Sequence, residues 1–287
     1  MSKFKGIIAL DIDGTLTTQA DRLEQRVSQF LNELIEDRWR LIFLTGRTFS
    51  FANPLLASLQ GNYFIAVQNG AAFIEMPQKR IVKKHYLSAD VIEKIDAIFA
   101  AQGGGLLVES GQENGDICFY KPSDYTKEEL NYIDFRKAIS PEKWVEVNSF
   151  NEIDLESFAV GKYFSNEERA YTIAKHISQI PHSTFNITVI RDHFHPGFFI
   201  THVNEEGASK GRILDCFIAM QEEKMLVIGA GDDYNDAEML EKSAVKIVME
   251  DAPKPLCEIA DIIAPTAEKQ GIIAALKEAI ERYGRNR

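Results

Sequence analysis

The stretch IIALDIDGTL, residues 7–16, decides the fold of this chain. Its short apolar run ends abruptly in two aspartates, Asp11 and Asp13, which are separated by a single isoleucine. Apolar runs of this length are typical of parallel strands that are covered on both faces. Like charges at the end of such a strand repel one another unless a cation neutralises them. The stretch therefore predicts a buried strand that leads directly into a functional site.

Both ends of the chain alternate apolar runs with helical patterns. After the first strand, apolar runs occur at 41–44 and 63–67, and apolar residues recur at helical spacing from about 21 to 38. Near the C-terminus, apolar runs at 225–229, 245–248 and 261–264 are again separated by helical segments. This alternation predicts an α/β fold with a Rossmann-like parallel sheet between two helical layers.

The middle of the chain has a different pattern. From about Arg80 to Phe198 the candidate strands are longer and richer in aromatic or alternating residues. Two helices here are expected to begin with capping boxes, at Thr126 and at Ser165. We therefore predict an α+β domain at 83–197 that is inserted between the two parts, 1–82 and 198–287, of the α/β domain.

The overall charge and the cysteines limit the class of protein. A formal net charge of −11 over 287 residues argues against a nucleic-acid or anionic-membrane partner, because phosphate groups repel such a surface. The three cysteines are far apart and in no CxxC spacing, which is typical of reduced thiols in the cytoplasm. The apolar run near the N-terminus is too short for a signal peptide. We expect a cytoplasmic monomer or homodimer.

Polar residues follow three of the predicted core strands. Because ligands of a parallel sheet bind beyond the carboxyl ends of its strands, these residues are expected to meet at one edge. Their potential ligand atoms are all oxygens, without a nearby histidine or cysteine, and this favours a hard ion such as Mg²⁺. The residues concerned are Asp11, Asp13 and Gly14, then Thr45, Gly46 and Arg47, and finally Asp232, Asn235 and Asp236.

Lys210 supplies the opposite charge. Ser209 is the expected N-cap of a helix, so Lys210 lies in its first turn, where the helix dipole disfavours a cation. A residue that breaks a local rule indicates a functional demand, such as an anionic substrate group at the same edge. Each motif alone has an ordinary interpretation as a turn, a strand end or a surface charge. Together, four unrelated coincidences would have to meet at one edge of the sheet.

The four motifs DIDGT (11–15), LTGR (44–47), GASKG (207–211) and GDDYND (231–236) resemble, in this order, those of the haloacid dehalogenase superfamily of phosphohydrolases. The long insert between the second and third motifs is similar to the cap of the Cof-type sugar-phosphate phosphatases. The resemblance implies a Mg²⁺-dependent phosphatase that acts on a small phosphorylated metabolite, with a sugar phosphate as the expected substrate.

The resemblance also implies roles for individual residues. Asp11 is the expected nucleophile, which forms an aspartyl-phosphate, and Asp13 the general acid and base. The expected metal ligands are Asp11, the backbone carbonyl of Asp13, and Asp232. Thr45 and Lys210 are expected to take part in catalysis by binding phosphoryl oxygens, and Asp236 to lie in the outer shell. The residues expected to contact substrate are Gly14, Thr45, Gly46, Arg47, Asn69, Lys210 and Asn235.

Several points remain open at this level. Arg47 is as well explained by an ion pair at the domain edge as by a phosphate contact. Asn69-Gly70 is as well explained by a tight turn as by a position at the border of the active site. Asp233 occupies a variable position and is expected to be solvated. Arg191, His193 and His195 are candidate polar residues of the cap, and the two histidines are expected to be structural, with contacts to substrate hydroxyl groups as the second interpretation, rather than a metal pair.

Three alternative functions fit the same motifs less well. A phosphomannomutase-like transferase would have a longer glycine-containing fourth motif and an arginine-rich cap. A sucrose-phosphate or mannosyl-3-phosphoglycerate phosphatase remains possible within the same broad family. A non-enzymatic regulatory protein would not need the acid at Asp13.

Overall fold

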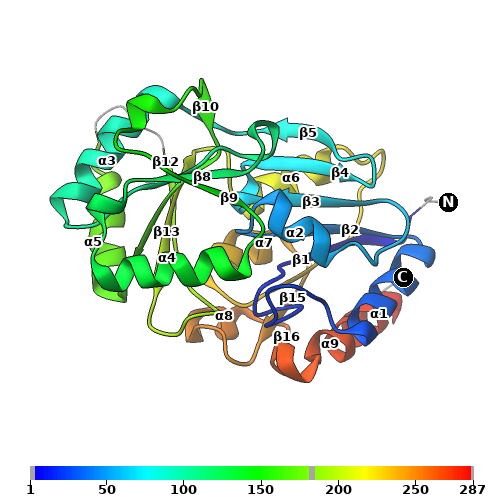
Figure 1. Ribbon diagram of the computed structural model, residues 1–287. Helices are drawn as coiled ribbons and strands as arrows, with labels where there is room; N and C mark the ends of the chain where they lie inside the picture. The colour runs from blue at the N-terminus through cyan, green and yellow to red at the C-terminus, as the bar shows by residue number, and fades with distance from the viewer. Residues whose placement is uncertain (1–3, 181–184, 286–287) are drawn as a thin grey trace.

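An eight-stranded sheet forms the first of two units in the computed structural model, which describes residues 4–180 and 185–285 (Figure 1). Its strand order is β16-β15-β14-β1-β2-β3-β4-β5, and the neighbours from β16 to β3 pair in parallel. The predicted parallel core is confirmed, with two antiparallel strands added at one edge. The strands are β1 (Gly6–Leu10), β2 (Trp39–Leu44), β3 (Tyr63–Val67), β4 (Ala72–Met76), β5 (Arg80–Lys84), β14 (Val227–Gly231), β15 (Val245–Met249) and β16 (Ile262–Ala264).

Helices cover both faces of this sheet, which gives the predicted three layers. One face packs against α1 (Gln25–Glu36), α2 (Phe49–Leu55) and α9 (Gly271–Arg285). The other face packs against α6 (Lys210–Ala219), α7 (Ala237–Lys242) and α8 (Lys254–Ile259). Successive residues of β1 alternate between the two apolar clusters, which explains why the whole strand is apolar and fully buried.

A six-stranded sheet forms the second unit, the cap, in the order β12-β13-β11-β7-β8-β9. Apolar side chains of α3 and α5 pack on one face of this sheet, and those of α4 pack on the other. The capping box at Thr126 is confirmed for α4, whereas α5 begins one residue later than predicted, with Asn166 as its N-cap. The cap elements are β7 (Leu107–Glu109), β8 (Ile117–Tyr120), β9 (Lys143–Glu146), β11 (Val160–Ser165), β12 (Phe185–Arg191), β13 (Phe199–Glu205), α3 (Ile92–Ala101), α4 (Lys127–Ile139) and α5 (Glu167–Ile177).

Short elements complete the chain. The two-stranded sheet β6–β10 lies where the chain passes between the two units. These strands are β6 (Leu87–Ser88) and β10 (Ser157–Phe158), and the 3₁₀ helices are η1 (Gln68–Gly70), η2 (Ala89–Val91), η3 (Gln112–Asn114), η4 (Pro122–Asp124), η5 (Phe150–Glu152), η6 (Tyr234–Asp236) and η7 (Ala267–Lys269).

The strand pairing shifts both predicted domain boundaries toward the C-terminus. β5 pairs with β4 and extends the core sheet to Lys84, two residues past the predicted limit at 82. β13 pairs with β11 and β12, so it belongs to the cap although 198 was the predicted return to the core. The core resumes after Glu205. Apolar and polar residues alternate in only part of β13, so the sequence alone does not show which sheet the strand joins. Its hydrogen-bonded neighbours, β11 and β12, assign it to the cap.

Acidic cap residues contact the start of α2 in the core. Asp116 accepts a hydrogen bond from the backbone N–H of Ser50 at 2.7 Å, and Glu142 accepts one from the Thr48 hydroxyl. Burial raises the pKa of Asp116 to about 6, and the charges of Glu109 and Glu142 add to this. This part of the contact between the units is therefore most stable when Asp116 is protonated.

The contribution of Asp116 to the stability of the protein should fall as the pH rises through this range. The folded form of Asp116 binds its proton more tightly than the unfolded chain does, so between about pH 4 and 6 ionisation costs folding free energy. We expect Asp116→Asn to match the wild type at pH 4 and to exceed its unfolding free energy at pH 7 by about 1–3 kcal/mol. Urea denaturation across this pH range measures the difference, with the exposed Asp90→Asn as the control. An equal gap at both pH values would contradict the assignment.

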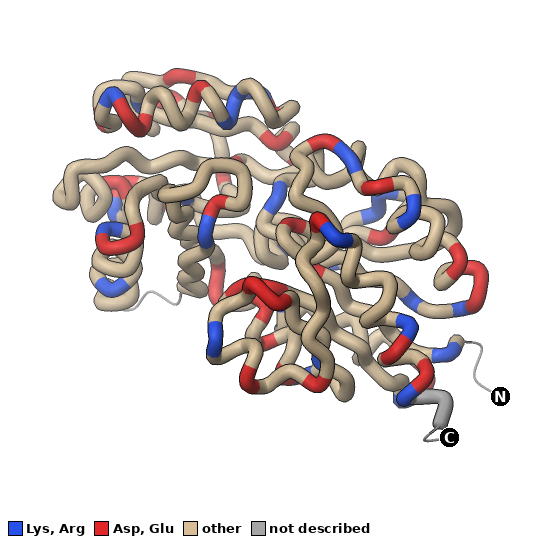
Figure 2. The backbone as a smooth tube through the Cα atoms, turned by 90° about the horizontal axis from the view of Figure 1, so that it is seen from below, with Lys and Arg blue, Asp and Glu red and all other residues tan. Residues whose placement is uncertain are grey.

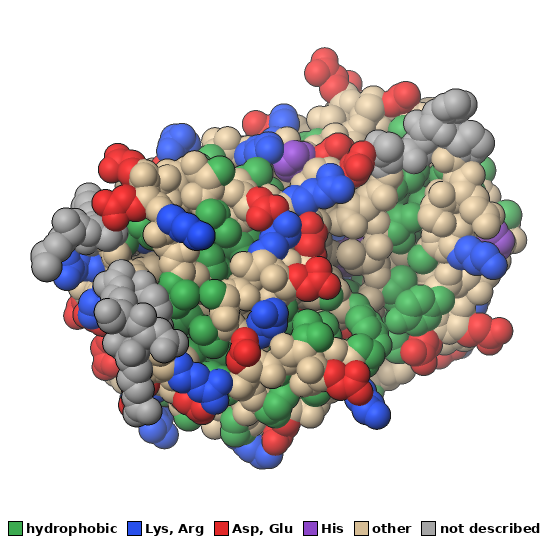
Figure 3. Space-filling model, turned by 180° about the vertical axis from the view of Figure 1, so that it is seen from behind, with side chains coloured by type: hydrophobic (Ala, Val, Ile, Leu, Met, Phe, Trp, Pro, Cys, Tyr) green, Lys and Arg blue, Asp and Glu red, His purple; other side chains and the backbone are tan. Residues whose placement is uncertain are grey.

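Charged side chains of both signs are mixed over the surface. Figure 2 shows acidic and basic residues interspersed along both units, and the face in Figure 3 has the same mixture. Among the described residues, no helix is both long enough and apolar enough to cross a membrane.

Candidate active site

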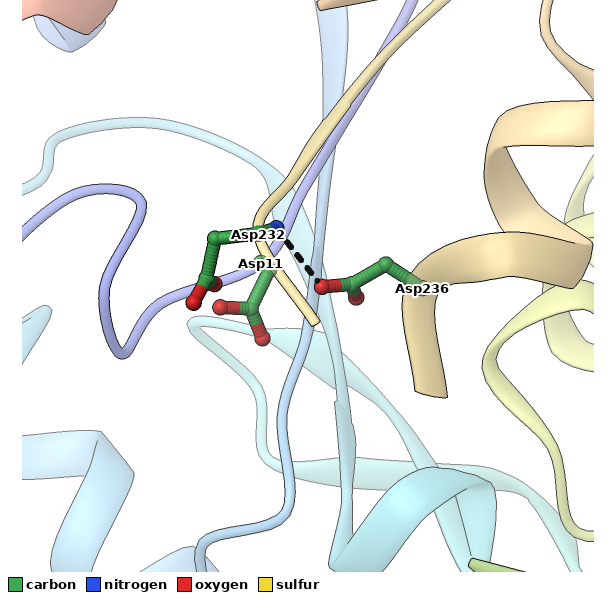
Figure 4. A group of neighbouring side chains, drawn as sticks. All are labelled: Asp11, Asp232 and Asp236. Atoms are coloured by element: carbon green, nitrogen blue, oxygen red, sulfur yellow. Dashed lines mark hydrogen bonds between the residues drawn. The ribbon is translucent and has the colours of Figure 1, made fainter. Parts of the chain in front are cut away.

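Two buried aspartates lie next to each other at the carboxyl ends of neighbouring strands. Asp11 follows β1 and Asp232 follows β14, and these strands pair directly. Figure 4 shows both side chains together with Asp236, which comes from η6. One carboxylate oxygen of each of the three residues lies within 4.8 Å of the others. The structure thus places Asp11 beside the fourth motif, as predicted.

Lys210 reaches this cluster from the first turn of α6. Its ammonium group forms an ion pair with Asp11 and another with Asp236, at 2.6 Å in the second case. Ser209 is the N-cap of the helix, as predicted. The side chain of Lys210 is 1% exposed, so the charge is buried with its partners. The first turn of the helix thus places a cation where it meets carboxylates.

One lysine does not balance the acidic cluster. Burial raises the pKa of Asp11 to about 7 against the opposing effect of Lys210, and the charges of Asp236 and Asp13 raise it further. Burial and the charge of Asp11 also raise the pKa of Asp232. A divalent cation beside these carboxylates would lower both pKa values and allow both groups to ionise. The donor set therefore fits a hard cation such as Mg²⁺.

The three carboxylates differ in how many of their oxygens are committed. Asp236 accepts from Lys210 with one oxygen and from the backbone N–H groups of Asp232 and Asp233 with the other, at 3.0 and 3.2 Å. Asp232 accepts from the Thr15 hydroxyl at 3.1 Å. Asp11 and Asp232 thus remain the better metal ligands, while Asp236 positions Lys210 and the Asp232 loop.

Gly14 allows the first motif to approach Asp232 closely. Its φ of +82° lies in the left-handed region that favours glycine. A Cβ atom at this position would lie 2.4 Å from the Asp232 carboxylate and 2.6 Å from the ring of His193. The DIDGT turn therefore needs glycine for both its conformation and its proximity to the site.

The second motif lies beside the first. Thr45 is fully buried after β2, and its hydroxyl oxygen accepts the backbone N–H of Arg47 at 3.1 Å. Arg47 donates to both oxygens of Asp13, with distances of 2.6 to 3.1 Å. Burial favours the neutral form of Asp13, yet Arg47 outweighs it and lowers the pKa of this carboxyl group. Arg47 therefore forms an ion pair with Asp13. An ion pair was one of the two interpretations of Arg47 from the sequence, the other being a phosphate contact.

Asn69 links the core site to the cap. It has a left-handed conformation, with φ of +56°, in the turn after β3. Its side-chain oxygen accepts from Asn235 at 3.1 Å, and its nitrogen contacts Nδ1 of His202 at 2.5 Å. The turn predicted from Asn69-Gly70 is present, and its side chain also bridges the two units.

Two expectations for residues near the fourth motif need revision. Asp233 is buried rather than solvated, because it caps η6 and accepts the backbone N–H of Arg191 at 3.2 Å. His193 lies in the site, with Nε2 at 3.4 Å from Asp232, although it was expected to be structural. His195 does pack in a cluster of aromatic rings that includes Tyr132 and Phe198.

A cavity extends from Asp11 and Asp13 toward the cap. Cap residues that line it include Arg136, Lys162 and His202, none of which was singled out from the sequence. The available signal was a charged or polar residue within an otherwise apolar strand, at Lys162 in FAVGKYF and at His202 in FITHVNE. Without the strand register, that signal does not indicate which face of the sheet these residues share.

Comparisons with known proteins agree with the family that the motifs resemble and with the fold. A family model described as haloacid dehalogenase-like hydrolase matches residues 8–276. A phosphoglycolate phosphatase of Methanothermobacter thermautotrophicus is 22% identical over 271 residues, which cover 94% of this chain and 96% of that protein.

Two solved structures have the same fold. A haloacid dehalogenase-like hydrolase from Bacteroides thetaiotaomicron superposes with a TM-score of 0.73 at 24% identity, covering 98% of this chain and all of the other. A haloacid dehalogenase subclass IIB sugar phosphatase superposes with a TM-score of 0.72 at 19% identity, covering 95% and 98% of the two chains.

Proposed function

This chain belongs to the haloacid dehalogenase-like hydrolases and is a phosphatase of that family, and we propose that it hydrolyses a small phosphorylated metabolite in two steps through an aspartyl-phosphate on Asp11. The observation that carries the proposal is the convergence of Asp11, Asp232 and Lys210 from three remote segments of the chain. Lys210 pairs most closely with Asp11. A purely structural ion pair would not need Asp232 and Asp236 as two further buried carboxylates.

In the first step, a carboxylate oxygen of Asp11 attacks phosphorus. The new Asp11–phosphorus bond forms as the bond from phosphorus to the ester oxygen breaks. Asp13 gives a proton to the leaving alcohol, and for this it must first take up that proton and release its ion pair with Arg47, which stabilises the ionised form. Lys210 holds a phosphoryl oxygen and stabilises negative charge on it. The Thr45 hydroxyl has its lone pair engaged by the backbone of Arg47, so its proton is free to donate to another phosphoryl oxygen.

In the second step, water attacks the phosphorus of the aspartyl-phosphate. Asp13 takes a proton from this water, and the phosphorus–Asp11 bond breaks to release inorganic phosphate and regenerate the carboxylate. The ion pair with Arg47 stabilises the ionised form of Asp13, which is the form that accepts a proton in this step. The same side chain thus donates a proton in one step and accepts one in the next.

Asp11, Asp232 and the backbone carbonyl of Asp13 would hold the metal ion. Bound Mg²⁺ would supply neutralisation of the acidic cluster and orientation of the phosphoryl group. We expect the physiological substrate to be a sugar phosphate, and the likeness of fold to a sugar phosphatase supports this class. The free cysteines support a reducing, cytoplasmic location for the reaction.

The test is phosphate release from p-nitrophenyl phosphate by the purified protein. We expect release with millimolar Mg²⁺, and a loss of at least a hundredfold in excess EDTA that added Mg²⁺ restores. Ca²⁺ should restore less activity, because it takes more ligands at longer distances. Full turnover in EDTA would contradict the metal assignment, and no turnover on p-nitrophenyl phosphate or a panel of sugar phosphates would contradict the phosphatase assignment.

A further inference from the structure

A row of polar residues, two of them buried, crosses the cap sheet on the side that faces the active site. Lys162 of β11 lies directly opposite His202 of β13, and His202 lies opposite Thr188 of β12. Residues paired in this way point to the same face of a sheet. Lys162 and His202 both line the cavity that contains Asp11, and they are 5% and 1% exposed. Polar groups buried so completely need partners.

His202 has a ring N–H without a partner among the described residues. The side-chain nitrogen of Asn69 donates to Nδ1, so the proton of the neutral ring is on Nε2. Burial lowers the pKa of His202 well below its usual range, with the charges of Lys162 and Arg136 adding to this, which keeps the ring neutral. Nε2 is buried and makes no hydrogen bond. The Cε1 atom of the His202 ring would lie 3.1 Å from a Cβ at Gly46, which belongs to the second motif.

Two of the cations that line the cavity, Lys162 and Arg136, also have donors to spare. Lys162 contacts Glu109 at 2.5 Å, which uses one of its three N–H groups. Nη1 of Arg136 lies 3.5 Å from Asp192, while Phe51 and Phe194 lie against the guanidinium. The guanidinium also donates to the Tyr132 hydroxyl oxygen, and of its five N–H groups those beyond these two contacts remain for a ligand.

The acidic cap residues that neighbour these two cations, Glu109 and Asp192, are already engaged. Glu109 accepts from Lys162 with one oxygen and from Gln68 with the other, at 2.8 Å. Asp192 accepts from the Tyr132 hydroxyl and from the backbone N–H of Phe194, at 2.8 Å in the second case. The cap side of the cavity thus offers a surplus of donors. A hydroxyl group would bring a further donor, whereas an anion brings acceptors alone.

From this surplus we infer that Arg136, Lys162 and His202 form a subsite for a second anionic group, a carboxylate or a second phosphoryl group, on the alcohol part of the substrate. The inference rests on the proposed function, because the same cavity must place the phosphate ester at Asp11. It narrows the expected sugar phosphates to those that also carry a carboxylate or a second phosphoryl group. Arg136 is the main determinant, since a planar fork with free N–H groups matches the geometry of either anion.

Competition against p-nitrophenyl phosphate tests the subsite, because it measures binding whether or not the competitor is turned over. We expect 3-phosphoglycerate to compete at a concentration at least tenfold below glycerol 3-phosphate, or fructose 1,6-bisphosphate at least tenfold below fructose 6-phosphate. The pair with the larger ratio identifies the anion as a carboxylate or as a phosphoryl group. Ratios near one in both pairs would overturn the inference while leaving the phosphatase intact. If the wild type released no phosphate from any ester, the proposed function itself would fail.

Variants assign the effect to residues. Arg136→Gln should reduce the larger ratio by about tenfold or more, and Arg136→Lys, which keeps the charge but not the fork, should reduce it by less. His202→Gln should retain more of the ratio than His202→Leu, because only glutamine keeps an N–H donor. Arg169→Gln is the matched control in the same unit, since Arg169 pairs with Glu129 outside this cavity. An unchanged ratio in a folded Arg136→Gln protein, checked by circular dichroism, would overturn the assignment.

Discussion

Replacement of Asp11 by asparagine should lower phosphate release by roughly 10⁴-fold or more, while the protein remains folded. Asparagine preserves the shape of the side chain but removes the anionic oxygen that attacks phosphorus. The fold should tolerate the change, because Lys210 keeps its second carboxylate partner, Asp236, at 2.6 Å. The substitution also removes one negative charge from a cluster in which Asp11 and Asp232 repel one another. Steady-state phosphate release and thermal unfolding measure the two effects separately.

Two controls make this result decisive. Asp11→Ala excludes activity that arises from slow deamidation of asparagine back to aspartate, since alanine cannot regenerate the nucleophile. Asp215→Asn changes an exposed aspartate of α6 that pairs with Lys242 and should leave turnover near the wild-type value. Retention of more than 1% of the activity in both Asp11 variants would assign the nucleophile to another group.

The core and its catalytic edge could be predicted because local sequence carries the information. β1 is apolar at every position, since helices cover both faces of the sheet, and its apolar run ends where Asp11 begins the site. Lys210 was recognisable because a cation in the first turn of a helix breaks a local preference. Both signals survive in the sequence without knowledge of any distant contact.

The contacts between the two units could not be predicted in the same way. Lys162 and His202 become neighbours only through the register of β11 and β13, which the turns and the burial of both strands fix together. The sequence also does not show that Asp236 commits both carboxylate oxygens to Lys210 and to backbone N–H groups. His193 was expected to be structural because its proximity to Asp232 depends on how the cap docks on the core.

Removal of the Lys210 charge should affect stability and turnover together. Lys210→Met would leave Asp11 and Asp236 buried without their cation, and breaking a buried ion pair in this way typically costs about 3–5 kcal/mol. We expect a similar loss of unfolding free energy at pH 7 without Mg²⁺, together with a fall in phosphate release of roughly a thousandfold. Urea denaturation and steady-state kinetics are the two measurements.

A second substitution separates these two effects of Lys210. In Lys210→Met/Asp236→Asn, one of the uncompensated charges is gone, so more than half of the lost stability should return. Turnover should not return, because the ammonium group that holds the phosphoryl oxygen is still missing. Mg²⁺ should also raise the unfolding temperature of Lys210→Met more than that of the wild type, since the unpaired carboxylates attract the cation more strongly. Recovery of both stability and turnover in the double variant would show that Lys210 acts only by neutralising its neighbours.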